Sequence, residues 1–100
     1  MTENDDNEKY EFEWDPKKAK RNLKKHGVSF EEASTIFDDP DFISFLDDEH
    51  SEDEDRQITI GLSNKARLLM AAHTERKKLI RIISARKATK SEEEFYNEAE

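Results

Sequence analysis

The chain has no cysteine, two glycines and two prolines among its 100 residues, and each scarcity excludes a class of site. Without cysteine there is no disulfide framework, and no thiolate is available to bind a metal ion or to act as a nucleophile. Two glycines cannot build the glycine-rich loops that cradle phosphates, and no such motif occurs. The sequence therefore predicts neither a disulfide-stabilised domain nor a nucleotide-binding enzyme.

Apolar residues are also scarce, at 33% of the chain against an average of about 45–50%. No apolar run approaches the 18 or so residues of a membrane span, and the acidic N-terminus lacks the apolar stretch of a signal peptide. One hundred residues suffice for one domain with a modest core, which excludes a large enzyme with a buried cofactor. We expect a small cytoplasmic protein with no membrane partner.

The net charge of −8 is the sum of blocks of opposite sign. Residues 1–15 carry a net −6 and 28–55 a net −12, whereas 16–27 carry +6 and 56–90 carry +9. If the two basic blocks share a face, they create the local positive field to which polyanions bind. The alternative is that basic and acidic blocks neutralise each other across the fold.

Two acidic stretches, residues 1–9 and Asp47–Asp55, have no hydrophobic periodicity. Such segments bury too little apolar surface to offset the entropy of ordering. The first is predicted to be a disordered arm and the second a solvated loop. The loop resembles a calcium site in composition only, because it lacks the glycine and the spacing of an EF-hand. Residues 10–100 are predicted to form a single domain.

Start and stop signals delimit three helices. Asp15 caps a helix that begins at Pro16 and ends at Gly27, and its thin apolar face consists of Ala19, Leu23 and His26. Two capping boxes open the other helices, Ser29 with Glu32 and Thr89 with Glu92. The second helix ends before a proline. Because about two residues separate the first two helices, we expect an αα-hairpin.

Apolar runs and alternating patterns predict the strands. A short strand covers 10–14, and four more follow at 42–46, 56–62, 67–74 and 79–85. The last run has apolar residues at both even and odd positions, which predicts a central strand covered on both faces. The predicted fold class is α+β: an antiparallel four-stranded meander packed with the N-terminal αα-hairpin and a C-terminal helix.

The candidates for chemistry are basic side chains on these elements. Arg81 lies inside an apolar strand and Arg86 ends it. A guanidinium there needs an anionic partner, either a ligand phosphate or a carboxylate such as that of Glu92. Arg67 and His73 have the same parity on one strand, so they share a face. No cluster has the spacing of metal ligands, so the sequence predicts no metal site and no cofactor.

RNA cleavage without a metal suits these groups. The 2′-hydroxyl must lose a proton, the phosphorane charge must be stabilised, and the 5′ oxygen must be protonated. Arginine and lysine supply the electrostatic stabilisation, and histidine can act as base or acid. The alternative for His26 is a structural role, as a cation at a helix C-terminus.

Three sequence segments carry a family pattern: FEWDPKK at 12–18, KHGVSFEEA at 25–33 and RIISARKA at 81–88. Further matching positions are Asn22, Phe37, Asp39, Pro40, Arg56, Gly61, Thr74, Glu75, Arg76, Glu92 and Tyr96. In this order and spacing, over about residues 12–97, the chain resembles the BrnT-type toxins of bacterial type II toxin–antitoxin systems. It departs from the pattern in having more acidic residues at 47–55 and in having Glu93 and Glu94. These carboxylates repel RNA phosphates and so weaken RNA binding.

The resemblance implies a RelE-like fold and a ribonuclease that cleaves RNA without a metal and inhibits translation. It also implies a cognate BrnA-like antitoxin, through which alone the complex reaches operator DNA. The catalytic candidates are Lys25, His26, Arg67, Arg76, Arg81 and Arg86. The candidates for positioning the substrate are His73, Glu92 and Tyr96.

Two other functions remain open at this point: a non-catalytic interaction module that acts only as an antitoxin-bound co-repressor, and an RNA-binding protein without cleavage. The discriminating feature is whether Arg67, Arg81, Arg86 and either His26 or His73 converge on one cleft. Pairing of the arginines with protein carboxylates would favour the interaction module.

Overall fold

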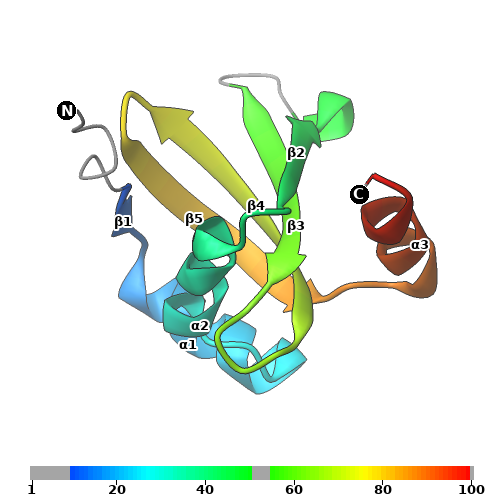
Figure 1. Cartoon of the computed structure of the whole chain (residues 1–100). Coiled ribbons are helices and arrows are strands. Elements are labelled where there is room, and N and C mark those ends of the chain that lie inside the picture. The colour runs from blue at the N-terminus through cyan, green and yellow to red at the C-terminus, as the bar shows by residue number, and fades with distance from the viewer. Residues whose placement is uncertain (1–9, 51–54, 100) are drawn as a thin grey trace, which may run out of the picture.

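In the computed structural model, which describes residues 10–50 and 55–99, five strands form one mixed sheet (Figure 1). In chain order they are β1 (Glu11–Glu13), β2 (Ile43–Leu46), β3 (Arg56–Leu62), β4 (Leu68–Arg76) and β5 (Leu79–Lys87). Across the sheet the order is β1-β5-β4-β3-β2, in which β2 to β5 form an antiparallel meander and β1 runs parallel to β5.

The prediction of a four-stranded, purely antiparallel sheet is therefore wrong. The meander leaves the outer edge of β5 open, and β1 pairs there over three residues, Glu11 to Glu13. The Glu11 N–H donates to the Lys78 carbonyl at 2.9 Å. Alternation predicted the short strand correctly, but it does not specify the edge with which a strand pairs.

The helices begin where their caps predict. They are α1 (Pro16–His26), α2 (Phe30–Ser34) and α3 (Lys90–Glu98), with 3₁₀ turns at Thr35–Asp38 and Asp48–His50. The Asp15 carboxylate accepts the Lys17 N–H at 2.9 Å, and Gly27 ends α1 at φ 72°. The capping box of Thr89 is complete. The Ser29 hydroxyl accepts the Glu32 N–H, but the Glu32 carboxylate turns away to other partners.

The sheet has two unlike faces. The αα-hairpin of α1 and α2 covers one, which we call the hairpin face, and the main core lies between them. That core consists of Val28, Phe30, Ala33, Ile36, Phe37, Leu69, Ala71, Ile80, Ile82 and Ala85. On the opposite face, which we call the open face, Tyr96 of α3 packs over Ile60 and Met70 at one end. The end of the open face near β1 carries none of the three helices (Figure 1).

Helix α1 packs through Ala19 of the predicted apolar face and through the amide of Asn22, but not through Leu23. Leu23 is 49% exposed, whereas Asn22 is buried. The Asn22 amide donates to the carbonyls of Val28 and Ala85 at 2.9 and 2.8 Å and accepts the Ala85 N–H at 3.1 Å. Because a buried amide with all its partners is stable in a core, this side chain fixes α1 against β5.

A β-bulge interrupts β5. Ala72 pairs with Ser84 and the next residue of β4, His73, pairs with Ile82, so Ile83 is an extra residue of β5. This bulge explains why apolar residues occur at both even and odd positions. Before the bulge the even-numbered residues face the core, and after it the odd-numbered residue Ala85 does. β5 does lie inside the sheet, between β1 and β4, but the expectation that both its faces are covered is wrong, because Leu79 and Arg81 are exposed on the open face.

The predicted disordered arm, residues 1–9, lies outside the described residues, as do residues 51–54 of the predicted acidic loop. Within the described part of that loop, Asp48–His50 forms the 3₁₀ turn. Among the described residues, none of the helices is long and apolar enough to span a membrane.

Candidate functional site

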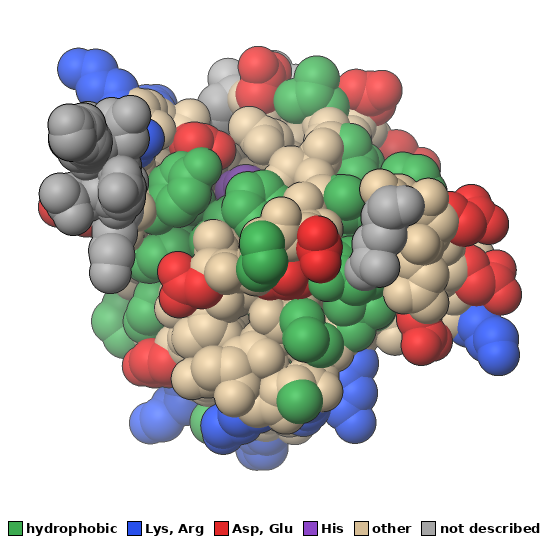
Figure 2. Space-filling view, in the orientation of Figure 1, with side chains coloured by type: hydrophobic (Ala, Val, Ile, Leu, Met, Phe, Trp, Pro, Cys, Tyr) green, Lys and Arg blue, Asp and Glu red, His purple; other side chains and the backbone are tan. Residues whose placement is uncertain are grey.

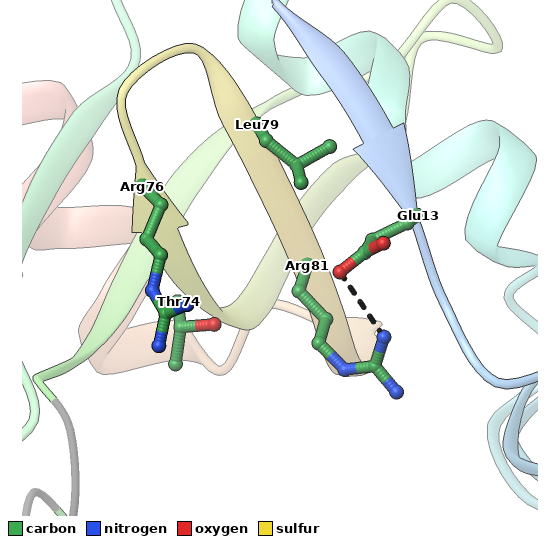
Figure 3. A pocket seen from close by; sticks show the side chains of 5 residues that line it. All are labelled: Glu13, Thr74, Arg76, Leu79 and Arg81. Carbon is green, nitrogen blue, oxygen red and sulfur yellow. Dashed lines mark hydrogen bonds and ion pairs between the residues drawn. The ribbon is translucent and has the colours of Figure 1, made fainter.

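Two arginines, a carboxylate and a hydroxyl line a hollow at the helix-free end of the open face (Figure 3). Its volume is about 120 Å³, and its lining comes from three adjacent strands: Glu13, Thr74, Arg76, Leu79 and Arg81. The register produces this cluster, because Arg81 pairs with Glu13 on one side and with Thr74 on the other, while Arg76 pairs with Leu79. Cross-strand neighbours point to the same face of a sheet.

Within this hollow, Arg81 and Glu13 form a loose ion pair. One guanidinium nitrogen, Nη1, donates to the Glu13 carboxylate at 3.2 Å. The two side chains are 49% and 45% exposed. An exposed pair with a single contact contributes little to stability. Both groups therefore stay accessible to a ligand, and a planar guanidinium suits a phosphate.

A second hollow lies between α1 and β5, where β1 has ended. Its volume is about 390 Å³, and Lys18, Arg21, Asn22, Lys25, His26, Ile83 and Ser84 line it. Because β1 pairs only with residues 79–81 of β5, the following residues of that strand border α1. Four of the seven lining residues are Lys, Arg or His, and none is acidic. The second hollow therefore attracts anions.

Arg67 is held in an ion pair beneath the hairpin. Its guanidinium donates to both oxygens of the buried Glu32 carboxylate, through Nη2 and through Nε, and also to the Gly27 carbonyl at 3.1 Å. The Ser63 hydroxyl donates to the same carboxylate at 2.7 Å. The hydrogen bond from Arg67 lowers the pKa of Glu32 more than burial raises it. This arrangement ties α2 to the loop before β4.

Arg86 forms a two-point ion pair with Glu92, the partner that the structural alternative anticipates. Nη1 and Nη2 donate to the two carboxylate oxygens at 2.8 and 3.0 Å. Glu92 also accepts the Thr89 N–H at 2.9 Å, within the capping box of α3. Burial raises the pKa of Glu92, but the bonds from Arg86 and Thr89 lower it below its usual value. The pair fixes the start of α3 to the end of β5.

His73 is fully buried on the hairpin face. Its Nε2 lies 2.7 Å from the Thr59 hydroxyl, and its ring packs edge-on against Phe37 at 5.1 Å between centroids. Among the described residues, its Nδ1 has no hydrogen-bond partner. Burial lowers the pKa of His73 to about 4, so the ring is neutral at pH 7. Its side chain does not reach the surface on which Arg81 lies.

Tyr96 connects α3 to the chain before β2. Its hydroxyl donates to Asp39 at 2.6 Å, and the same carboxylate accepts the Leu62 N–H at 2.8 Å. Burial raises the pKa of Asp39, but the hydroxyl and the backbone N–H groups of Leu62 and Asp41 lower it further, so that it lies below the usual value. The contact orients α3 over the open face.

The predicted site residues thus fall into separate places. Arg76 and Arg81 meet in the first hollow, and Lys25 and His26 line the second. The other five predicted residues do not line either hollow: Arg67, His73, Arg86, Glu92 and Tyr96. Within residues 10–50 and 55–99, no three His, Asp or Glu side chains gather as metal ligands.

Sequence reasoning did not propose Glu13 and Thr74 as site residues. Glu13 lies in an alternating run whose aromatic side chains, Phe12 and Trp14, pack against the core. Alternation therefore indicates that Glu13 faces outward. The signal that was missing is the parallel pairing with β5, which brings Glu13 beside Arg81.

The fold resembles that of a solved toxin. The chain superposes on the 1.1 Å crystal structure of the Brucella abortus ribonuclease toxin BrnT with a TM-score of 0.61 and 21% sequence identity, over 81% of this chain and 99% of that one. No curated protein sequence matches the chain significantly. The family model for the ribonuclease toxin BrnT of type II toxin–antitoxin systems matches residues 14–92. The chain therefore belongs to the BrnT family of ribonuclease toxins.

Proposed function

We propose that this protein cleaves RNA without a metal ion, in the first hollow. The observation that carries the proposal is the convergence of Arg76, Arg81 and Glu13, from three strands, on one exposed site beside Thr74. The two guanidinium groups supply positive charge where a phosphate would bind. That is the role that a metal ion fills in other nucleases.

The chemistry is an internal transfer at phosphorus. Glu13 takes the proton of a ribose 2′-hydroxyl, and the resulting oxygen attacks the adjacent phosphate. Arg81 and Arg76 stabilise the added negative charge of the phosphorane. The bond to the 5′ oxygen then breaks, and that oxygen takes a proton from solvent. The products are a 2′,3′-cyclic phosphate and a 5′-hydroxyl.

Lys25 and His26 act on RNA away from the cleaved bond in this proposal. Ile83 in the second hollow is two residues along β5 from Arg81 in the first, a distance of about 7 Å along a strand. RNA that crosses the edge of β5 reaches both hollows. The cationic side chains of α1 neutralise its flanking phosphates, which increases affinity at low salt.

The proposal includes the biological context that the family implies. RNA cleavage inhibits translation in the cytoplasm, and a cognate BrnA-like antitoxin neutralises the toxin. Operator DNA is contacted only through the antitoxin complex. The RelE-like classification of the fold stays a prediction.

The test is cleavage of a fluorescent single-stranded RNA by the purified chain in excess EDTA. We expect cleavage with a cyclic phosphate at the new 3′ end, at a rate that Arg81→Ala reduces by about 10²–10³. The matched control is Lys87→Ala, an exposed cation of the same strand that lines neither hollow. Activity that disappears in EDTA and returns with Mg²⁺ would disprove the metal-free mechanism.

A specific observation favours a second function, the non-catalytic interaction module. Arg67 and Arg86 both pair with glutamates, as expected for structural residues. Expression of the chain alone in a bacterium separates the two functions. Growth arrest supports the nuclease, whereas normal growth with abundant folded chain supports the module. Binding of RNA without product would instead indicate an RNA-binding protein.

A further inference from the structure

Two exposed phenylalanines from different elements contact each other at the edge of the sheet opposite to the hollows. Phe45 of β2 and Phe95 of α3 meet edge-on, with 5.8 Å between ring centroids. They are 41% and 51% exposed. Paired rings on a surface bring much apolar area to one spot, and such spots mark contact sites for other macromolecules.

In the part of the chain that the structure describes, one edge of the strand that carries Phe45 has no paired strand. β2 is last in the sheet order and pairs only with β3. The Asp47 N–H donates to the backbone carbonyl of Arg56, the residue directly opposite on β3, at 2.7 Å. In an antiparallel ladder this pattern alternates, so the backbone groups of Ser44 and Leu46 point away from β3. The strand has the sequence ISFL, without the charge or proline that protects an edge from pairing.

The surroundings of this edge are strongly acidic. Residues 38–50 carry six acids and no Lys or Arg, and α3 carries four glutamates and one lysine. Asp39 and Glu92 are engaged within the fold, but Asp38, Asp41, Glu93 and Glu94 are exposed. Figure 2 shows acidic side chains gathered over α3 at the right, and basic ones over α1 at the bottom. A partner for this surface must be basic.

We infer that β2 and α3 form the docking surface for the antitoxin, and that the antitoxin segment that binds is extended, rich in Lys and Arg, and carries a large apolar side chain. This inference rests on the proposed function, since it assumes an antitoxin. The segment adds a strand to the edge of β2 through the backbone of Ser44 and Leu46. Its apolar side chain packs against Phe45 and Phe95, and its cations face the surrounding carboxylates.

The surface lies on the same face of the sheet as the first hollow, at the opposite edge. Phe45 pairs with Ile58, which pairs with Ala72, in the cross-strand row beside the row that contains Thr74, Arg81 and Glu13. A segment bound at Phe45 therefore borders the open face at the edge opposite to β5, over which RNA is proposed to pass. A second copy of this chain would bring acid against acid, which disfavours self-association.

The test measures the dissociation constant between the chain and the protein encoded by the reading frame beside its own. Phe45→Ser with Phe95→Ser should weaken binding at least about 30-fold, as for loss of central aromatic contacts. Leu23→Ser is the matched control, an exposed leucine on α1, and should change binding less than about twofold. Leu46→Pro removes an outward N–H and should weaken binding about tenfold if a strand is added.

Each variant is also assayed for melting temperature and RNA cleavage. Unchanged melting and cleavage with lost binding supports the inference. A double variant that binds like the wild type overturns it, and so does a chain that dimerises alone through these phenylalanines. If the double variant unfolds, Phe95→Ser alone gives the same test. Because binding and cleavage are measured separately, a wild type without nuclease activity would refute the proposed function and leave this test intact.

Discussion

Two arginines of one strand, each beside a glutamate, mark the two ends of the open face and differ in how they are held. Arg86 is bound at two points by Glu92, which is itself fixed by the cap of α3. Arg81 has one contact of 3.2 Å with Glu13, and both side chains are about half exposed. The comparison shows that the number of contacts and the exposure distinguish an arginine that holds the fold from one that is available to a ligand.

The largest effect is expected when the loose pair is broken. Arg81→Ala should reduce the cleavage rate by about 10²–10³, as for loss of one preorganised donor, with an unchanged melting temperature. Arg81→Lys should recover only part of the rate, because a point charge replaces a planar fork. Single-turnover cleavage and thermal unfolding measure the two quantities. A lower melting temperature with an unchanged cleavage rate would show that Arg81 holds the fold and does not act on RNA.

The pair of Arg67 and Glu32 sharpens the comparison, because it is more enclosed than either pair on the open face. Arg67→Ala leaves the carboxylate of Glu32 buried with Ser63 as its remaining side-chain partner. The free energy of unfolding should fall by more than it does for Arg86→Ala, because the carboxylate left behind is the more buried one. Adding Glu32→Gln to Arg67→Ala should restore part of this free energy, since the uncompensated charge is removed. Urea denaturation of the single and double variants checks both statements.

Between about pH 4 and 6.5, the stability of the protein should depend on His73 of the hairpin face and not on the ion pairs of the open face. The folded pKa of His73, about 4, lies below the unfolded value of 6.5, so the unfolded chain binds the additional proton between these values. The contribution of His73 to the free energy of unfolding is fully present above pH 6.5. It falls as the pH decreases, by about 2 kcal/mol at pH 5. The lowered pKa values of Glu32, Asp39 and Glu92 act only below about pH 4.5.

His73→Gln isolates this contribution, because an amide retains a hydrogen bond to Thr59 without titrating. Denaturation at pH 7, 6 and 5 should show a steep decline in stability for the wild type and a shallow one for the variant. Equal slopes would mean that another group is responsible.

The smallest effect is expected at the tight pair. Arg86→Ala should lower the free energy of unfolding by about 1–2 kcal/mol, because charged hydrogen bonds to a partly exposed carboxylate are lost. RNA cleavage should stay within a few-fold of the wild type. A loss of cleavage as large as that for Arg81→Ala would place Arg86 in the catalytic site and remove the contrast between the two ends.

Local signals predicted most of the elements but not how they meet. Caps at Asp15, Gly27 and Thr89 and the alternation of the strands act over a few residues, and the structure confirms them. The parallel pairing of β1 joins residues far apart in the chain, as does the contact of Glu32 with Arg67. No local pattern encodes such partners. The candidate arginines were therefore predictable as a set, but their division into ion pairs and a hollow was not.

The bulge in β5 makes this strand sensitive to changes of length as well as of residue. Arg81 and Arg86 are separated by an odd number of positions, so a regular strand would turn them to opposite faces. The extra residue, Ile83, lets both reach the open face while Ile82 and Ala85 both stay in the core. Deletion of one residue at the bulge would change the composition very little, but it would turn the side chains at one end of the strand to the wrong faces of the sheet. Among relatives, the spacing between the two arginines should therefore vary less than the residues that lie between them.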